Sequence, residues 1–204
     1  MKFLLLAFLF VTSICSTSPA QSVFEKQGNI FFTDSTGSVV QLTFSGQDSN
    51  PLLSSDQSLI AFVHSGRGRA ISTGTGDYEP SELWLYDLVH KKTEQVLASK
   101  SARRMEDVIA TFTNIQFSND SKAIYFLTDA WTTSAAVHRV DLQSRRQTYI
   151  APGNSLEVIR EGKFKGDLKV RQHRYHKERG SYDCDYILSP EGKEIAVIPD
   201  SCDK

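Results

Sequence analysis

Leu53-Ser-Ser-Asp-Gln-Ser-Leu-Ile-Ala-Phe62 decides the fold of this chain, because the same pattern recurs twice further along. The later copies are Phe117-Ser-Asn-Asp-Ser-Lys-Ala-Ile-Tyr-Phe126 and Leu188-Ser-Pro-Glu-Gly-Lys-Glu-Ile-Ala-Val197. In each copy an apolar residue precedes a Ser-x-Asp or Ser-x-Glu turn, whose side chains can bond the local backbone, and a second apolar run follows. The pattern predicts three β-hairpins. The predicted turn residues are Ser55 and Asp56, Ser118 and Asp120, and Ser189 and Glu191.

Further pairs of apolar segments accompany these hairpins. They are residues 30–33 with 39–43, 82–88 with 93–97, and 136–142 with 147–150. A strand pair followed by a Ser-x-Asp hairpin makes four short antiparallel strands, which is the composition of one β-propeller blade. The sequence therefore predicts an all-β protein.

These units resemble the TolB-like repeats, also called WD40-like or PD40 repeats, of β-propeller proteins from the bacterial periplasm. The family pattern is roughly aromatic-Ser-Pro-Asp-Gly-x-x-Ile-x-Phe. Every copy departs from it somewhere, and the Pro and Gly survive only in the third copy, as Pro190 and Gly192. The resemblance implies the fold, but it says little about function, because propellers host unrelated activities.

The spacing of the copies differs from that of the family. The copies begin 64 and 71 residues apart, whereas one blade usually takes about 40 to 45 residues. We therefore predict insertions, and a partial or small β-propeller of three to four antiparallel four-stranded blades with a C-terminal β-meander. An open arc of blades leaves sheet edges exposed, and exposed edges invite pairing with other chains. Either the meander covers one edge, or a homodimer completes the propeller.

The first twenty residues have the layout of a secretory signal peptide, with Lys2, an apolar run at 3–11 and small residues up to Ala20. Cleavage there leaves Gln21 first and places the mature protein in the periplasm or outside the cell. The apolar run is about half the length that spans a bilayer, so no stable membrane insertion is expected. A lipoprotein cysteine at Cys15 is the alternative, although residues 12–14 fit that pattern poorly. We divide the chain into a signal peptide (1–20), the TolB-like repeats (21–160) and a meander that continues the same domain (161–204).

The charge balance and the cysteines bear on nucleic-acid binding and on a possible disulfide. The chain has 23 basic and 24 acidic residues, which gives no indication of nucleic-acid binding. After export, Cys184 and Cys202 are the remaining cysteines, and an oxidising compartment lets them pair. We predict a disulfide, with two unrelated thiols as the alternative.

The predicted insertions at 64–80 and 128–134 contain the residues of a candidate binding loop. Residues 64–80 are rich in glycine, and 128–134 contain a tryptophan. The first lacks the Gly-Lys-Ser/Thr ending of a phosphate loop, so a surface connector is the favoured interpretation. Long loops nonetheless carry function in many proteins. The candidate binding residues are Arg67, Arg69, Asp77 and Trp131.

Two C-terminal clusters contain residue types that occur in functional sites. His173 and His176 would point to opposite faces of a strand, among basic residues that repel a cation, so a basic hairpin tip is favoured over a metal site. Asp183 and Asp185 alternate on one side of a strand, as an acid–base pair would need. The favoured interpretation is a solvent-facing stripe beside the disulfide.

No nucleophile with a base, phosphate loop or closed set of metal ligands accompanies the repeats. We therefore assign no catalytic, metal-binding or cofactor-binding residues. We expect that the protein has no cofactor and is not an enzyme. The sequence favours an exported periplasmic module that binds an unknown envelope protein. The alternative is a small-ligand binder, or a hydrolase-type enzyme with its site on the loop face.

Overall fold

The computed structural model describes residues 20–178 and 180–203, which form an all-β structure. Its strands pair antiparallel into three four-stranded sheets, one three-stranded sheet and one two-stranded hairpin. The first sheet contains β1 (Ser22–Lys26), β2 (Asn29–Thr33) and β3 (Val39–Gln41). The second contains β4 (Asp48–Leu53), β5 (Leu59–Ser65), β8 (Ser81–Asp87) and β9 (Lys92–Ala98).

The remaining sheets follow in chain order. The third contains β10 (Thr113–Phe117), β11 (Ala123–Trp131), β12 (Ser134–Asp141) and β13 (Gln147–Pro152). The fourth contains β14 (Ser155–Val158), β15 (Leu168–His176), β16 (Gly180–Leu188) and β17 (Glu194–Ile198). The hairpin is β6 (Ile71–Ser72) with β7 (Asp77–Tyr78), and two short 3₁₀ helices are η1 (Met105–Asp107) and η2 (Pro199–Ser201).

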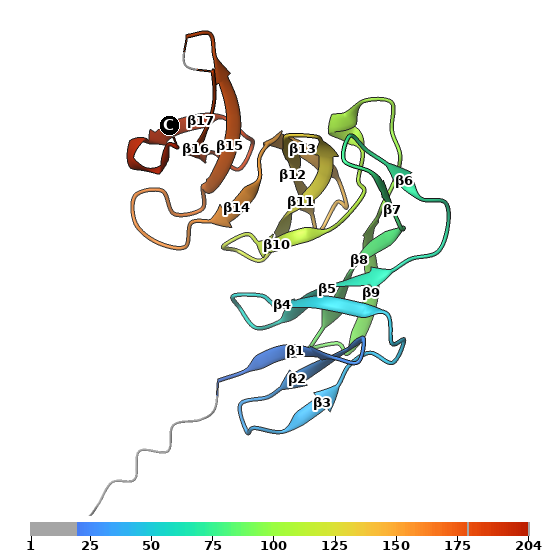
Figure 1. Cartoon of the computed structure of the whole chain (residues 1–204). Coiled ribbons are helices and arrows are strands. Elements are labelled where there is room, and N and C mark those ends of the chain that lie inside the picture. The colour runs from blue at the N-terminus through green and yellow to red at the C-terminus, as the bar shows by residue number, and fades with distance from the viewer. Residues whose placement is uncertain (1–19, 179, 204) are drawn as a thin grey trace, which may run out of the picture.

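The four sheets follow one another around an open arc, with β1–β3 at one end and β15–β17 at the other (Figure 1). The first strands of neighbouring sheets contact one another, β1 with β4, β4 with β10 and β10 with β14, so these strands lie along the inner side of the arc. The predicted meander consists of β15, β16 and β17, and it shares its sheet with β14.

Apolar side chains fill the space between successive sheets. Alternation along each strand gives an inner sheet two apolar faces, one toward each neighbour. Ile30 and Phe32 of the first sheet pack on Phe62 of the second. Val63 and Leu85 pack with Phe126 of the third sheet, and buried residues of the third and fourth sheets form another cluster. Each interface joins two adjacent sheets.

The structure corrects the predicted order of the hairpins within a blade. The sequence places a strand pair before each Ser-x-Asp hairpin, but the first hairpin, β4–β5, shares its sheet with the pair that follows it, β8–β9. The second hairpin, β10–β11, likewise precedes β12–β13. The long segment between β5 and β8 hides this pairing in the sequence.

The third copy of the motif also occupies a different place. It joins β16 to β17, the third and fourth strands of its sheet, whereas the first two copies join first and second strands. In an antiparallel sheet both kinds of turn lie at the same end of the strands. All three motif turns therefore lie on one face of the arc, and the segments at 66–80 and 132–133 lie on the opposite face.

The predicted signal peptide and Cys15 lie outside the described residues, apart from Ala20. Among the residues that the structure describes, no helix is both long and apolar enough to cross a membrane.

Candidate functional site

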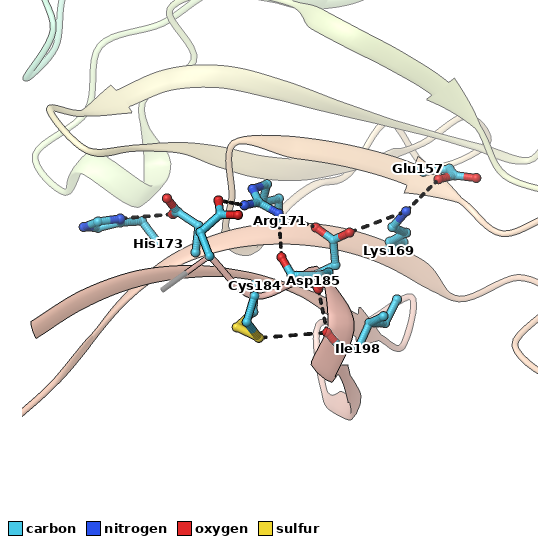
Figure 2. Close-up of polar contacts among 11 residues, drawn as sticks. Glu157, Lys169, Arg171, His173, Cys184, Asp185 and Ile198 are labelled. Carbon is cyan, nitrogen blue, oxygen red and sulfur yellow. Dashed lines mark hydrogen bonds and ion pairs between the residues drawn. A yellow bond between two sulfur atoms is a disulfide. The ribbon is translucent and has the colours of Figure 1, made fainter. Parts of the chain in front are cut away.

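The outward face of the fourth sheet carries a ladder of charged side chains (Figure 2). Lys169 Nζ lies 3.7 Å from Glu157 Oε2 and 3.5 Å from Asp185 Oδ2. Arg171 Nη1 lies 3.4 Å from the other oxygen of Asp185 and also pairs with Asp203. Opposite charges thus alternate across the strands, and each cation lies between two carboxylates.

Asp183 and Asp185, whose spacing would suit an acid–base pair, take part in separate ion pairs. Asp183 Oδ1 lies 3.0 Å from Nδ1 of His173, and Asp185 binds Lys169 and Arg171. The stripe beside the disulfide is therefore the arrangement found. Among the described residues, no group of three or more His, Cys, Asp or Glu side chains is placed to hold a metal ion.

Cys184 and Cys202 form the predicted disulfide. It ties the C-terminal tail to the buried side of β16 while the charged ladder occupies the other side. Arg171 donates to the carbonyl of Ser201 at 3.1 Å, and Ser201 Oγ accepts the backbone amide of Asp185 at 2.8 Å. The disulfide indicates an oxidising compartment outside the cytoplasm.

The opposite end of the arc presents apolar side chains. Phe24 of β1 and Phe31 of β2 face each other across the strands, and their rings stack 5.3 Å apart. Alternation places them on the face turned away from the second sheet, where Phe24 is 38% exposed. Val39 of β3 lies on the same face and is also exposed. The two ends of the arc thus differ sharply in chemistry.

The two predicted insertions meet on one face of the arc. The backbone amide of Gly74, in the β6–β7 turn, donates to the carbonyl of Ala130 at 2.7 Å. Thr132 Oγ1 donates to the carbonyl of Gly74 at 3.2 Å. The segment at 64–80 thus contains a short hairpin docked on the neighbouring sheet, whereas the sequence favoured a surface connector and offered it as a candidate binding loop.

The four residues of the candidate binding loop do not converge on one site. Asp77 is exposed and accepts a 2.6 Å bond from Ser72 Oγ, whereas Trp131 packs edge-on against Tyr149. Arg67 lines a separate hollow of about 650 Å³. Arg69 is exposed.

Sequence reasoning missed a partly buried pair of the second sheet, Asp48 of β4 and His64 of β5. Asp48, only 3% exposed, lies with Oδ1 2.7 Å from Nδ1 of His64 and accepts a 2.6 Å bond from Ser45 Oγ on its other oxygen. The imidazole packs edge-on against Trp84, with 6.0 Å between ring centres. The Arg67 hollow and a second of about 340 Å³ both reach His64. An ionisable pair therefore borders two hollows at this position.

A one-residue bulge explains why this pair was missed. Regular pairing from the Ser54 turn would place Ser49 opposite His64, but the register shifts between Ser49 and Leu52, so Asp48 takes that place. Asn50, within the shift, has a φ of 51°. The third sheet shifts in the same way beside Asn114, whose φ is 45°. The sequence signal for both bulges is an Asn four residues before a turn serine, Asn50 before Ser54 and Asn114 before Ser118.

The motif turns have the predicted chemistry, with one correction. The serine that bonds Asp56 is Ser54, at 2.6 Å, and not Ser55, which is exposed. Ser118 bonds Asp120 at 2.7 Å in the same way. These serine hydrogen bonds are the main reason why the pKa of Asp56 and that of Asp120 lie below the usual value.

The third turn has the same serine–carboxylate hydrogen bond, but with a glutamate in place of the aspartate. Ser189 Oγ donates to Glu191 Oε2 at 3.0 Å. All three motif carboxylates therefore accept a serine hydroxyl, which indicates a structural role in closing the turns.

Comparison with known proteins identifies the architecture. No family model matches the chain, and no curated protein matches it. Among solved structures, TolB from Acinetobacter baumannii is 15% identical with a TM-score of 0.54, covering 88% of this chain and 42% of that one. Porphyromonas gingivalis dipeptidyl peptidase 4 is 14% identical with a TM-score of 0.60, covering 87% and 31%.

A third match is the β-propeller domain of the Trilobed protease from Pyrococcus furiosus, at 13% identity and a TM-score of 0.54, covering 83% of this chain and 48% of that domain. The chain spans less than half the length of each of these three proteins. The likeness confirms the predicted fold, a partial β-propeller of four-stranded antiparallel sheets. At these identities it shows the fold alone.

Proposed function

We propose that this chain is an exported protein-binding module that acts in the periplasm or outside the cell, where the first sheet receives an envelope protein. The observation that carries the proposal is the contrast between the ends of the arc. A partner that covers the Phe24–Phe31 face removes apolar surface from water, which stabilises association. A partner on the charged ladder would have to desolvate groups that already neutralise one another.

Site-specific photo-crosslinking in the producing cells tests this proposal. A photoreactive phenylalanine analogue at Lys26, which alternation places on the same face of β1 as Phe24, should give a discrete adduct with another protein. The same analogue at Val89, 71% exposed in the β8–β9 turn, should give none. Phe24→Ser should abolish the Lys26 adduct while leaving the thermal unfolding midpoint nearly unchanged. Equal adducts at both positions, or none at Lys26, would count against the proposal.

A second candidate function is small-ligand binding beside His64. Because Asp48 holds Nδ1, Nε2 is the nitrogen left to meet a ligand, and the two hollows place both apolar and polar side chains around it. Pockets of several hundred Å³ with a few polar groups are typical of small-molecule sites.

Fragment screening by NMR tests this second candidate. A mixed set of carboxylic acids, amines and sugars should shift the Trp84 indole N–H signal in the wild type and in His90→Ala but not in His64→Ala. His90 is the matched control, because its Nδ1 lies 2.7 Å from Asp87 in an exposed turn. Shifts that persist in His64→Ala, or no shift with any fragment, would remove this candidate.

A further inference from the structure

The outer edge of the first sheet is strand β3, because within the described part of the chain this sheet lacks the fourth strand that the other sheets have. The second, third and fourth sheets have four strands each, whereas the first has three and ends at β3. The 340 Å³ hollow lies beside this edge, between Leu42 and Phe44, which follow β3, and Trp84 of the second sheet. Val40 points toward the second sheet but is 50% exposed, because no fourth strand covers it.

The backbone of β3 is arranged to accept another strand. The amide of Leu42 donates back to the carbonyl of Ile30 in β2 at 2.8 Å. Because backbone groups alternate in direction along an antiparallel strand, the N–H and C=O groups of Val39 and Gln41 point to the open side. A strand laid beside β3 would satisfy them.

The open edge lacks the side chains that protect strand edges in monomeric proteins. Such edges usually carry charged residues or proline, which oppose pairing with another chain. The other outer strands follow this rule, with Lys92 and Glu94 in β9, Pro152 in β13 and Glu194 in β17. Residues 35–47, which include β3 and its flanks, contain no Lys, Arg, Asp or Glu. This edge is the unprotected one.

We propose that the β3 edge pairs with the β3 edge of a second copy, antiparallel about a two-fold axis at Val40, and joins the two first sheets into one continuous sheet. Val39 of each copy then exchanges backbone hydrogen bonds with Gln41 of the other, and the two Val40 side chains cover each other. An interface of this kind uses the same surface twice. The uncharged segment meets itself, so no like charges are brought together.

This arrangement replaces the ring-completing homodimer that the repeat count alone would suggest. In a closed ring, the Phe24–Phe31 face would have to pack on the outward face of a fourth sheet. That contact would strip water from Lys169, Asp185 and Arg171 and give them apolar neighbours. Pairing at β3 leaves the charged ladder in solvent and the Phe24–Phe31 face free for a protein partner.

Light scattering of the mature, oxidised protein over a wide concentration range tests the pairing. The wild type should convert from monomer to dimer as concentration rises. Val40→Lys should weaken the dimer by about tenfold or more, because it places two ammonium groups opposite each other. Val89→Lys, an exposed valine replaced on a different surface, should change nothing. A wild type that stays monomeric, or a dimer that tolerates Val40→Lys, overturns the proposal.

A cysteine at the axis tests the register independently. Val40→Cys should form an intermolecular disulfide, because residues at the centre of an antiparallel pair lie within bonding range of their own copy. Val89→Cys should stay reduced under the same conditions, and a Val40→Cys protein that stays reduced contradicts the register. The inference goes beyond the proposed function, because it concerns a second copy of the chain and another surface of the first sheet. A wild type that stays monomeric but still gives the Lys26 adduct would refute only the inference. A wild type that self-pairs at β3 but gives no Lys26 adduct would refute only the proposed function.

Discussion

Gly74 in the β6–β7 turn and Ala130 at the end of β11 are joined by a 2.7 Å hydrogen bond from the Gly74 amide to the Ala130 carbonyl. A Cβ atom at position 74 would lie 2.9 Å from that carbonyl oxygen and 3.2 Å from the amide of Thr132. Both contacts are with backbone, which cannot move aside as a side chain can. The glycine therefore allows the β6–β7 hairpin to rest on the next sheet.

Replacing Gly74 with valine should release this hairpin without unfolding the protein. We expect amide hydrogen exchange in residues 71–78 to accelerate by about tenfold or more, while the free energy of unfolding changes by less than about 1 kcal/mol. Exchange mass spectrometry and urea unfolding measure the two quantities. Arg69→Ala, an exposed change in the same loop, should leave both unchanged. Unaltered exchange in the Gly74 variant would show that the hydrogen bond does not hold the hairpin.

The motif serine should contribute to stability only where its hydroxyl is buried. Ser54 is almost fully buried, bonds Asp56 and accepts the amide of Leu59 at 2.9 Å. Ser54→Ala should therefore lower the free energy of unfolding by about 1 to 3 kcal/mol. Ser55→Ala, one residue along and exposed, should stay within about 0.5 kcal/mol of the wild type. Equal effects of the two changes in urea unfolding would contradict the assignment of the motif serine.

The limits of the sequence prediction have a common physical cause. Local patterns located the hairpins, because turn chemistry and alternation depend on neighbouring residues. They did not show that β5 pairs with β8 across a long loop, nor that the third motif joins β16 to β17, because strand partners are chosen by packing between sheets. The Asp48–His64 pair depends on a single bulge, and a slip of one residue exchanges which side chains meet.

The Cys184–Cys202 disulfide should account for a substantial part of the stability of the fourth sheet. It closes a segment with a sequence separation of 18, for which the chain-entropy model gives about 3 kcal/mol. The Cys184→Ala, Cys202→Ala double variant should unfold at correspondingly lower urea concentration. A reducing agent should destabilise the wild type to the same level and leave the double variant unaffected. A wild type that is insensitive to full reduction would contradict this estimate.

His138 should make stability depend on pH. This side chain is fully buried between the second and third sheets, and burial, aided by the charge of Lys100, lowers its pKa from 6.5 to about 4. Its Nδ1 lies 2.6 Å from the amide nitrogen of Gln147, so the neutral ring accepts that hydrogen bond. At a pH between about 4 and 6.5, His138 is protonated in the unfolded chain but neutral in the folded protein. Stability should therefore be complete above about pH 6.5 and should fall as the pH drops toward 4.

The expected loss from this one group is about 3 kcal/mol, the free-energy equivalent of the pKa difference. Urea unfolding of the wild type and of His138→Gln at pH 7.5 and pH 4 measures it as a difference of differences. Protonation of the motif carboxylates also destabilises the protein at low pH. Both proteins contain these carboxylates, so their contribution cancels in the comparison. His138→Gln should destabilise the protein at pH 7.5 and yet lose less on acidification than the wild type. Parallel losses in the two proteins would mean that the His138 imidazole is not excluded from protonation in the folded state.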